Sequence, residues 1–216
     1  MSEIKVNKIS PATGTETTLG DTNDKFIVPS GAELEVASGA TITNAGTATN
    51  FGSSGFTLAT PIVTTSGTSA TWTGIPSGTT CIILSLSQFS TNTNNQVIFV
   101  RLGDAGGIET SGYYSTGLQT DGGSISDTER YTDGLDLAGY ADFDVAKNWN
   151  GNVLLALQNA TTFTWTMQST GGTSNLDQLF INAGSKALSG ELTQVQLCTQ
   201  TGSATFDLGE ANLMYQ

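Results

Sequence analysis

The chain has 216 residues, a formal net charge of −12 and no histidine, and only 12% of its residues are charged. Glycine, threonine, serine and asparagine make up 96 of the residues, a composition typical of a β-rich protein whose surface carries hydroxyls and amides instead of charges. The lack of histidine excludes His-dependent catalytic triads and His-ligated zinc sites, and the acidic balance argues against binding to nucleic acid or to an anionic membrane surface.

The first 25 residues alternate weakly at Ile4, Val6 and Ile9 and then consist mainly of Thr, Gly and Asp. A segment with so little apolar surface does not fold alone, so we predict a docking arm over residues 1–25 whose three apolar side chains order against a partner. Neither a signal-peptide core nor an apolar stretch of about 18–20 residues is present, so we expect neither export through a signal sequence nor membrane insertion.

Residues 26–60 contain a short repeat with a period of about eight. It superposes Ser30-Gly31-Ala32 on Ser38-Gly39-Ala40, and Leu34 on Ile42. Each unit resembles a short alternating strand followed by a Ser-Gly turn, and such a strand cannot bury a core alone. We predict a homotrimeric β stem in which other copies supply the missing walls. An ordinary hairpin packed on the next domain is the alternative.

The remaining residues, 61–216, are predicted to form a head domain of about eight to eleven strands with no convincing helix. Regularly spaced strands separated by turn residues are typical of an all-β sandwich, which we expect to be jelly-roll-like. The expected strands are 70–74, 81–89, 96–102, 112–118, 124–132, 140–146, 153–158, 162–168, 178–182, 192–199 and 205–208, and they are followed by the apolar run 211–215.

Alternation within these strands predicts which side chains are buried. Trp72 and Trp165 lie inside alternating runs and are expected in the core, and Cys81 and Cys198 are expected to be small buried hydrophobes and not a disulfide framework. Residues 163, 165 and 167 should share one face, with threonines on the other.

Nine carboxylates lie between residues 104 and 144, with Arg130 as the one basic residue among them. The loops 121–127 and 133–136 are candidates for a Ca²⁺ site because that ion prefers oxygen ligands, but neither matches a known calcium-loop pattern. A solvated acidic edge is the favoured interpretation, so no metal site is predicted. Among nine carboxylates, a pair at the spacing that a glycosidase needs is expected by chance, so the number of carboxylates is little evidence for a glycosidase.

Aromatic side chains in polar, glycine-rich stretches indicate a different kind of site. Sugar rings stack their apolar faces on exposed tyrosine and tryptophan, and we predict a glycan platform that includes Tyr113, Tyr114 and Trp149, with Tyr131 and Tyr140 nearby in sequence. Neighbouring residues on a strand point to opposite faces, so only one of Tyr113 and Tyr114 can be fully buried.

No motif supports catalysis. The glycine-rich run 103–107 lacks the Lys-Ser/Thr and the strand-to-helix context of a phosphate loop, and the lysines that could activate a serine are few. We therefore expect no enzymatic activity, no catalytic residues and no cofactor.

Four groups of phrases follow one another along the head domain. They are TSGT at 65–68 with WTGIPSG at 72–78; VRLGD at 100–104 with GIETSGY at 107–113; AGSKALSGELTQV at 183–195; and TFDLG at 205–209 with ANLMY at 211–215. In this order they resemble the C-terminal domain of a family of bacteriophage virion proteins, many of them tail fibres or structural proteins of marine and cyanobacterial phages. The front of the chain, at residues 28–32 and 47–51, is also similar to stems that precede such domains.

This resemblance implies a β-sandwich head on a β stem, a homotrimer mounted on a phage particle that is assembled in the host cytoplasm. The leading hypothesis is a non-enzymatic tail fibre or spike, docked through its arm on another virion protein and presenting its head domain to a host-surface glycan or receptor. A head decoration or capsid fibre that contributes to capsid stability or weak adhesion is the alternative, and a glycan depolymerase with paired carboxylates is a second alternative.

Overall fold

The structure is a computed structural model that describes residues 27–28, 30–32, 35, 37–38, 40, 55–121, 124–126, 130–137, 143, 145 and 147–216. The chain forms two compact units, Met1–Phe51 and Gly52–Gln216. The second unit, the head domain, contains every strand of the described part of the chain and no helix. The described residues therefore include no helix that could cross a membrane.

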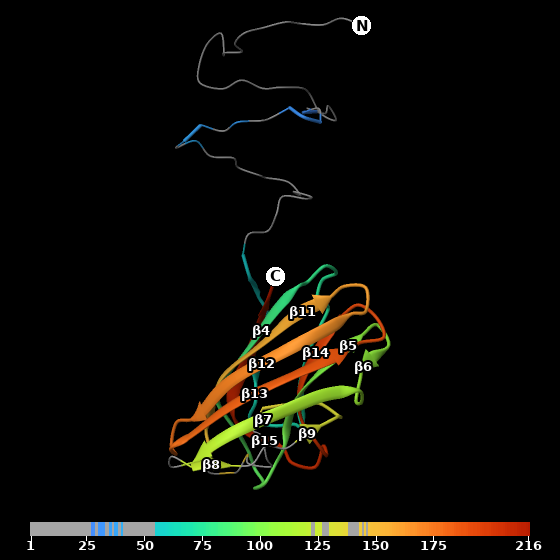
Figure 1. Ribbon diagram of the computed structural model, residues 1–216. Coiled ribbons are helices and arrows are strands. Elements are labelled where there is room, and N and C mark those ends of the chain that lie inside the picture. Colours follow the sequence, from blue (N-terminus) through green and yellow to red (C-terminus); the bar gives the residue numbers. More distant parts are fainter. Residues whose placement is uncertain are drawn as a thin grey trace, which may run out of the picture. The chain divides into compact units, whose positions relative to one another are not determined.

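The larger of two antiparallel sheets has ten strands, and its central strands run side by side in Figure 1. Its order is β1-β15-β4-β11-β12-β13-β7-β8, with β2 also paired to β15 and β9 to β7. The strands are β1 (Thr57–Leu58), β2 (Ile62–Val63), β4 (Cys81–Thr91), β7 (Tyr113–Asp121), β8 (Ser124–Ser126), β9 (Arg130–Tyr131), β11 (Trp149–Asn159), β12 (Thr164–Thr173), β13 (Gln178–Ala187) and β15 (Phe206–Tyr215).

The smaller sheet has five strands in the order β10-β5-β14-β3, with β6 also paired to β5. They are β3 (Ser69–Thr73), β5 (Ile98–Asp104), β6 (Gly107–Ile108), β10 (Leu135–Asp136) and β14 (Gln194–Thr199). The central strand β5 is buried on both faces. Ile98, Val100 and Leu102 join the main core, and Phe99 packs in a second cluster with Val97, Cys198 and Tyr131.

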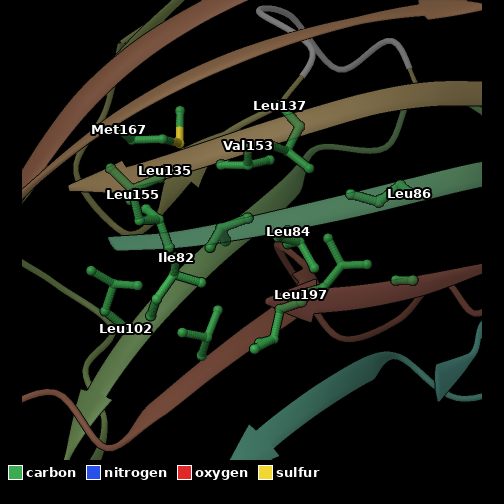
Figure 2. Packing of buried hydrophobic residues seen from close by; sticks show 14 of the residues in the cluster. Ile82, Leu84, Leu86, Leu102, Leu135, Leu137, Val153, Leu155, Met167 and Leu197 are labelled. Atoms are coloured by element: carbon green, nitrogen blue, oxygen red, sulfur yellow. The ribbon is translucent and has the colours of Figure 1, made fainter. Parts of the chain in front are cut away.

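One hydrophobic core lies between the two sheets (Figure 2). Ile82 and Leu84 from β4 and Leu155 from β11 are fully buried in the same cluster as Leu102 and Leu197 from the smaller sheet. Side chains on a strand alternate between its faces, so each sheet contributes one face to this shared core. The predicted all-β sandwich is confirmed.

Trp149 occupies a space in the core that two glycines provide. A Cβ on Gly171 would lie 2.0 Å from Trp149 Cζ2, and a Cβ on Gly151 would lie 2.8 Å from Trp149 Cη2. Both distances are far below van der Waals contact, so the indole ring fits only where these neighbours lack side chains. Phe143 packs beside it, with ring centroids 6.2 Å apart.

The expected core residues and strands agree with the structure at most positions. Trp72, Trp165 and Cys198 are buried, Cys81 is half-buried, and both cysteines are free. The predicted strand 205–208 and the apolar run 211–215 form one strand, β15, which continues through register shifts against β4. Most of the predicted strand 140–146 lies outside the described residues.

In the N-terminal unit, Ser30 and Gly31 form a turn, and Gly31 has a φ of 83°, which favours glycine. A second turn follows around Ser38, where the Ala40 N–H donates to the Ala37 carbonyl at 3.0 Å. Both turns lie at the Ser-Gly positions of the eight-residue repeat. The docking arm with Ile4, Val6 and Ile9, and most of the predicted stem strands, lie outside the described residues.

Candidate functional site

The three rings of the predicted glycan platform lie in different environments. Tyr113 and Trp149 are fully buried in the core, whereas the Tyr114 side chain is 75% exposed. Buried rings have no face to offer a ligand, so only Tyr114 remains available for stacking. The expectation that one of the two adjacent tyrosines is buried and the other exposed is confirmed.

Tyr114 lies on the outer face of the larger sheet because β7 alternates in burial along its length. It pairs with Ser185 of β13, and the next outward residue of β7, Thr116, pairs with Ala183 of β13 and with Arg130 of β9. Directly opposed residues of an antiparallel pair share one face of the sheet. The three strands therefore bring Tyr114, Thr116, Ser185 and Arg130 to one surface.

A hollow of about 610 Å³ lies at this position, which we call the Tyr114 cleft. It is lined by the exposed Tyr114 and Arg130 side chains and by the small residues Ala183 and Gly184, among others. The lining residues are Tyr114, Ser115, Thr116, Arg130, Tyr131, Thr132, Ala183, Gly184 and Ser185.

The cleft offers one aromatic face, several hydroxyl groups and one guanidinium. No carboxylate is among its lining residues. An aromatic ring and hydroxyls suit a ligand that presents both apolar C–H faces and hydroxyl groups, and a guanidinium donates to several acceptors at once. The arrangement is suited to binding a polyhydroxylated ligand.

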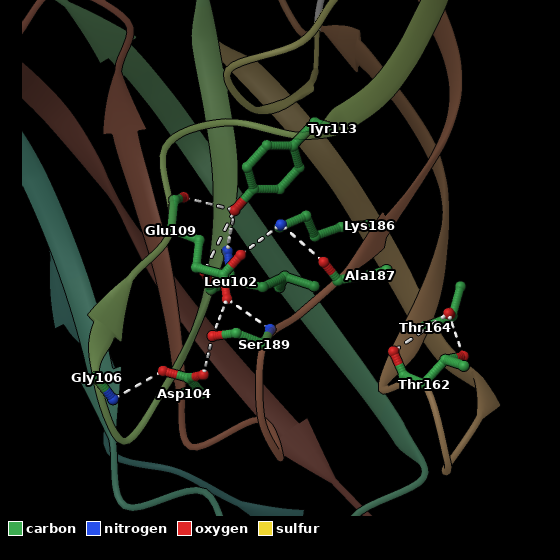
Figure 3. Close-up of polar contacts among 10 residues, drawn as sticks. All are labelled: Leu102, Asp104, Gly106, Glu109, Tyr113, Thr162, Thr164, Lys186, Ala187 and Ser189. Atoms are coloured by element: carbon green, nitrogen blue, oxygen red, sulfur yellow. Dashed lines mark hydrogen bonds and ion pairs between the residues drawn. The ribbon is translucent and has the colours of Figure 1, made fainter.

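A second polar cluster lies inside the sandwich, behind the cleft (Figure 3). Lys186 points inward from β13, is almost fully buried, and forms an ion pair with Glu109. Its Nζ also donates to the Ala187 carbonyl at 2.8 Å and lies 5.3 Å from the centre of the Tyr113 ring. Such a buried cation is tolerated because it is paired and hydrogen-bonded.

The Tyr113 hydroxyl connects the two sheets. It accepts from the Leu102 N–H at 2.9 Å and donates to the Glu109 carbonyl at 2.8 Å. Burial raises the pKa of Tyr113 well above its usual range, so the hydroxyl stays protonated and able to donate. This hydroxyl therefore joins β7 of the larger sheet to β5 of the smaller one.

Ser189 bridges two carboxylates in the same cluster. Its Oγ donates to Asp104 Oδ2 at 2.6 Å and lies 2.9 Å from Glu109 Oε1, and its N–H donates to Glu109 Oε1 at 2.8 Å. The hydrogen bond from Ser189, followed by that from the Gly106 N–H, lowers the pKa of Asp104. Burial opposes ionisation of Glu109, but hydrogen bonds from Lys186 and Ser189 outweigh it and lower its pKa. Both carboxylates are held ionised.

The acidic loops considered for calcium binding do not assemble a metal site within the described ranges, which contain no group of three or more Cys, Asp or Glu side chains suited to a metal ion. The Asp133 carboxylate faces Arg101 at 3.8 Å, and the Asp136 N–H donates to Ser115 Oγ at 2.8 Å. Asp136 itself is buried. The loop 121–127 lies partly outside the described residues.

Several residues of both sites are not predictable from the local sequence. Arg130 stands out only as a single base among acidic residues, and no local pattern assigns a role to Ser185 or Lys186. Alternation from Tyr114 places Thr116 on the same face, but the pairing of β7 with β9 and β13 is a long-range feature that a local pattern does not specify.

No protein-family model matches the chain, and neither the search of curated proteins nor the search of solved structures gives a match.

Proposed function

We propose that this chain is a non-enzymatic attachment protein of a bacteriophage particle, a homotrimeric fibre or spike whose head domain binds a host-surface glycan. The observation that carries the binding part of this proposal is the Tyr114 cleft, where an exposed tyrosine ring stands over a hollow of about 610 Å³. The resemblance of the phrases between residues 65 and 215 to phage virion proteins supports the assignment to a virion.

The chemistry of the cleft favours a sugar over other ligands. Tyr114 offers a ring face for the apolar side of a sugar, and the hydroxyls of Thr116, Thr132 and Ser185 match sugar hydroxyls as donors or acceptors. A few convergent polar groups beside an aromatic surface are what small-ligand sites in proteins commonly provide. Arg130 adds a donor for ring oxygens or for a carboxylate on the sugar.

The carboxylate pair Asp104 and Glu109 does not favour the depolymerase alternative. Glycoside hydrolysis requires one carboxyl group that stays protonated as a general acid, which needs a raised pKa. Asp104 and Glu109 both have lowered pKa values and both accept from Ser189. Their hydrogen bonds stabilise the sandwich and leave neither group suited to donate a proton to a leaving group.

The test is a binding measurement of the full chain against a panel of bacterial surface polysaccharides. We expect one class to bind, and Tyr114→Ala to weaken that binding by about 30-fold, the loss typical of a central tyrosine worth about 2 kcal/mol. Thr166→Ala, on the same face but outside the cleft, is the matched control and should bind like the wild type. Equal affinity of Tyr114→Ala and wild type would remove the cleft from the proposal.

Two further measurements test the remaining parts. Antibodies raised against the head domain should label the phage particle in electron micrographs, and lack of labelling would contradict the virion assignment.

Incubation of the protein with the polysaccharide that it binds should release no reducing sugar. Release that is abolished by Asp104→Asn or Glu109→Gln would instead establish a depolymerase.

A further inference from the structure

Strand β13 exposes apolar side chains on its outer face and buries several polar ones on its inner face. Its inward residues include the core residue Phe180 and also Gln178, Asn182 and Lys186, all buried, whereas its outward residues include Leu179 and Ile181, each about half exposed. In an isolated sandwich in water, the apolar side chains are expected to face the core.

Strand β7 has a similar mixture. Its inward residues are the buried ring of Tyr113 and the buried polar side chains of Ser115 and Gln119, and Ser115 Oγ accepts from the Asp136 N–H. Leu118 is an outward residue of β7, so this strand also places an apolar side chain on the outer face.

The outward apolar residues are contiguous. Ile181 is paired directly with Leu118, Leu179 with Thr120, and Thr120 with Ile125 of β8. Ile125 is 75% exposed, and Leu179 and Ile181 are 45% and 46% exposed. We call Leu118, Ile125, Leu179 and Ile181 the outer apolar patch. Contiguous exposed apolar side chains of this kind mark interaction surfaces.

The charge distribution indicates which partner covers the patch. The chain carries a net charge of −12, yet on β4, β11, β12, β13 and β7 the described outward side chains include no charged group. Two copies of so acidic a chain repel each other wherever their carboxylates meet, and this face is where they can approach without that repulsion. Depletion of charge around an apolar centre is also the composition of protein–protein interfaces.

We propose that the outer apolar patch packs against the same face of another copy of this chain, so that the head domains of the trimer contact each other through the outer face of the larger sheet. This inference rests on the trimer of the proposed function and is independent of glycan binding. The Tyr114 cleft borders this interface, because its lining residue Thr116 lies two residues from Leu118 along β7, and Tyr114 itself lies four residues, or roughly 14 Å, from Leu118.

The area of the uncharged outer face determines how strong the contact between two head domains can be. The strands β4, β11, β12, β13 and β7 lie about 4.8 Å apart, and with about six residues in register they form a footprint of roughly 20 by 20 Å, or about 400 Å² per copy. A standard interface buries about 800 Å² per partner. The head contact is therefore expected to strengthen a trimer that the stem also holds, and its loss should raise the concentration at which the trimer dissociates.

The experiment is sedimentation equilibrium of the full chain and three variants over a wide range of concentration. Ile181→Glu places a charge at the centre of the patch and should raise the dissociation concentration by at least tenfold, and Ile125→Glu should act in the same direction. Leu208→Glu, at an exposed leucine on β15 outside the patch, is the matched control and should dissociate like the wild type.

The possible outcomes separate this inference from the proposed function. A wild-type chain that is monomeric at every concentration overturns both the trimer and the head contact. A trimer that dissociates at the same concentration in the wild type and all three variants overturns the head contact alone. Near-ultraviolet circular dichroism confirms folding of each variant, and Ile125→Glu decides the matter if Ile181→Glu does not fold, because Ile125 is the more exposed residue.

Discussion

The β7–β13 strand pair has two faces of opposite character, although their key residues are neighbours in sequence. On the inner face Tyr113 pairs with Lys186, and both are buried in a network that joins the two sheets. On the outer face Tyr114 pairs with Ser185 in an open cleft. The buried polar groups of this strand pair connect the two sheets, whereas the exposed ones remain available to a ligand. Substitutions on the inner face should therefore lower the free energy of unfolding, and substitutions in the cleft should lower ligand affinity.

The largest difference is expected between Lys186 and Ser185. Lys186→Met leaves Glu109 without its cation, and unpairing a buried charge costs 3–5 kcal/mol. Because the Glu109 side chain keeps 23% of its exposure, we expect about 3 kcal/mol, the lower end of that range. Ser185→Ala should change the free energy of unfolding by less than about 0.5 kcal/mol. Urea denaturation of both variants measures the difference.

The double variant Lys186→Met/Glu109→Gln provides the control for this pair. It removes the unpaired charge, so part of the lost stability should return. If Lys186→Met alone lowers the free energy of unfolding by less than about 1 kcal/mol, water screens the ion pair between Lys186 and Glu109. That result would contradict the prediction that this pair behaves as a buried one.

A smaller difference is expected when one hydroxyl is removed from each face. Tyr113→Phe leaves the buried Leu102 N–H without its acceptor, which should cost about 2 kcal/mol. Tyr114→Phe removes a hydroxyl from a largely exposed side chain and should leave the free energy of unfolding unchanged within about 0.5 kcal/mol. Thermal denaturation followed by circular dichroism checks both variants, and equal losses would contradict the assignment of the two faces.

The inner network should also make stability depend on pH in the acid range. Asp104 and Glu109 have lowered pKa values in the folded protein, so the unfolded chain binds more protons as the pH falls. Their contribution is complete above the ordinary pKa of Glu, 4.5, and is lost as the pH falls through the folded values. Urea denaturation at pH 7 and pH 3 should show this loss.

Glu109→Gln tests the source of the acid sensitivity. This variant should lose less stability between pH 7 and pH 3 than the wild type does, because its amide does not titrate. Asp177→Asn removes a carboxyl from the exposed turn between β12 and β13 and is the matched control. Equal pH dependence in Glu109→Gln and the wild type would place the acid sensitivity elsewhere in the chain.

The sequence predicted the sandwich well because most core strands alternate clearly. In β12, Trp165 and Met167 face the core with threonines between them, as expected from the period of two. Trp149 could not be placed in the same way. It lies in a polar, glycine-rich stretch, where we expected an exposed ring. Its burial depends on Gly171, which leaves space for the indole and lies on the paired strand, and on Gly151, whose lack of a side chain leaves room for both the indole and the paired backbone.

The candidate site was predictable only in part. Adjacent tyrosines must lie on opposite faces, but the rest of β7 gives no reason to bury Tyr113 in preference to Tyr114, since its inward residues are Ser115, Gly117 and Gln119. The choice depends on Lys186 and Glu109, which lie on other strands and loops. Long-range pairing of this kind determines the site and leaves no local signal.

The smallest effect on stability, and the sharpest test of the comparison, is expected for Tyr114→Ala. The side chain is 75% exposed, so its removal loses little buried apolar surface, and the free energy of unfolding should stay within about 0.5 kcal/mol of the wild-type value. The trimer should dissociate at the wild-type concentration, because Tyr114 lies outside the outer apolar patch. Glycan affinity should nevertheless fall by about 30-fold. A variant that loses binding together with stability would show that Tyr114 supports the fold, and the outer face would then not be specialised for contact.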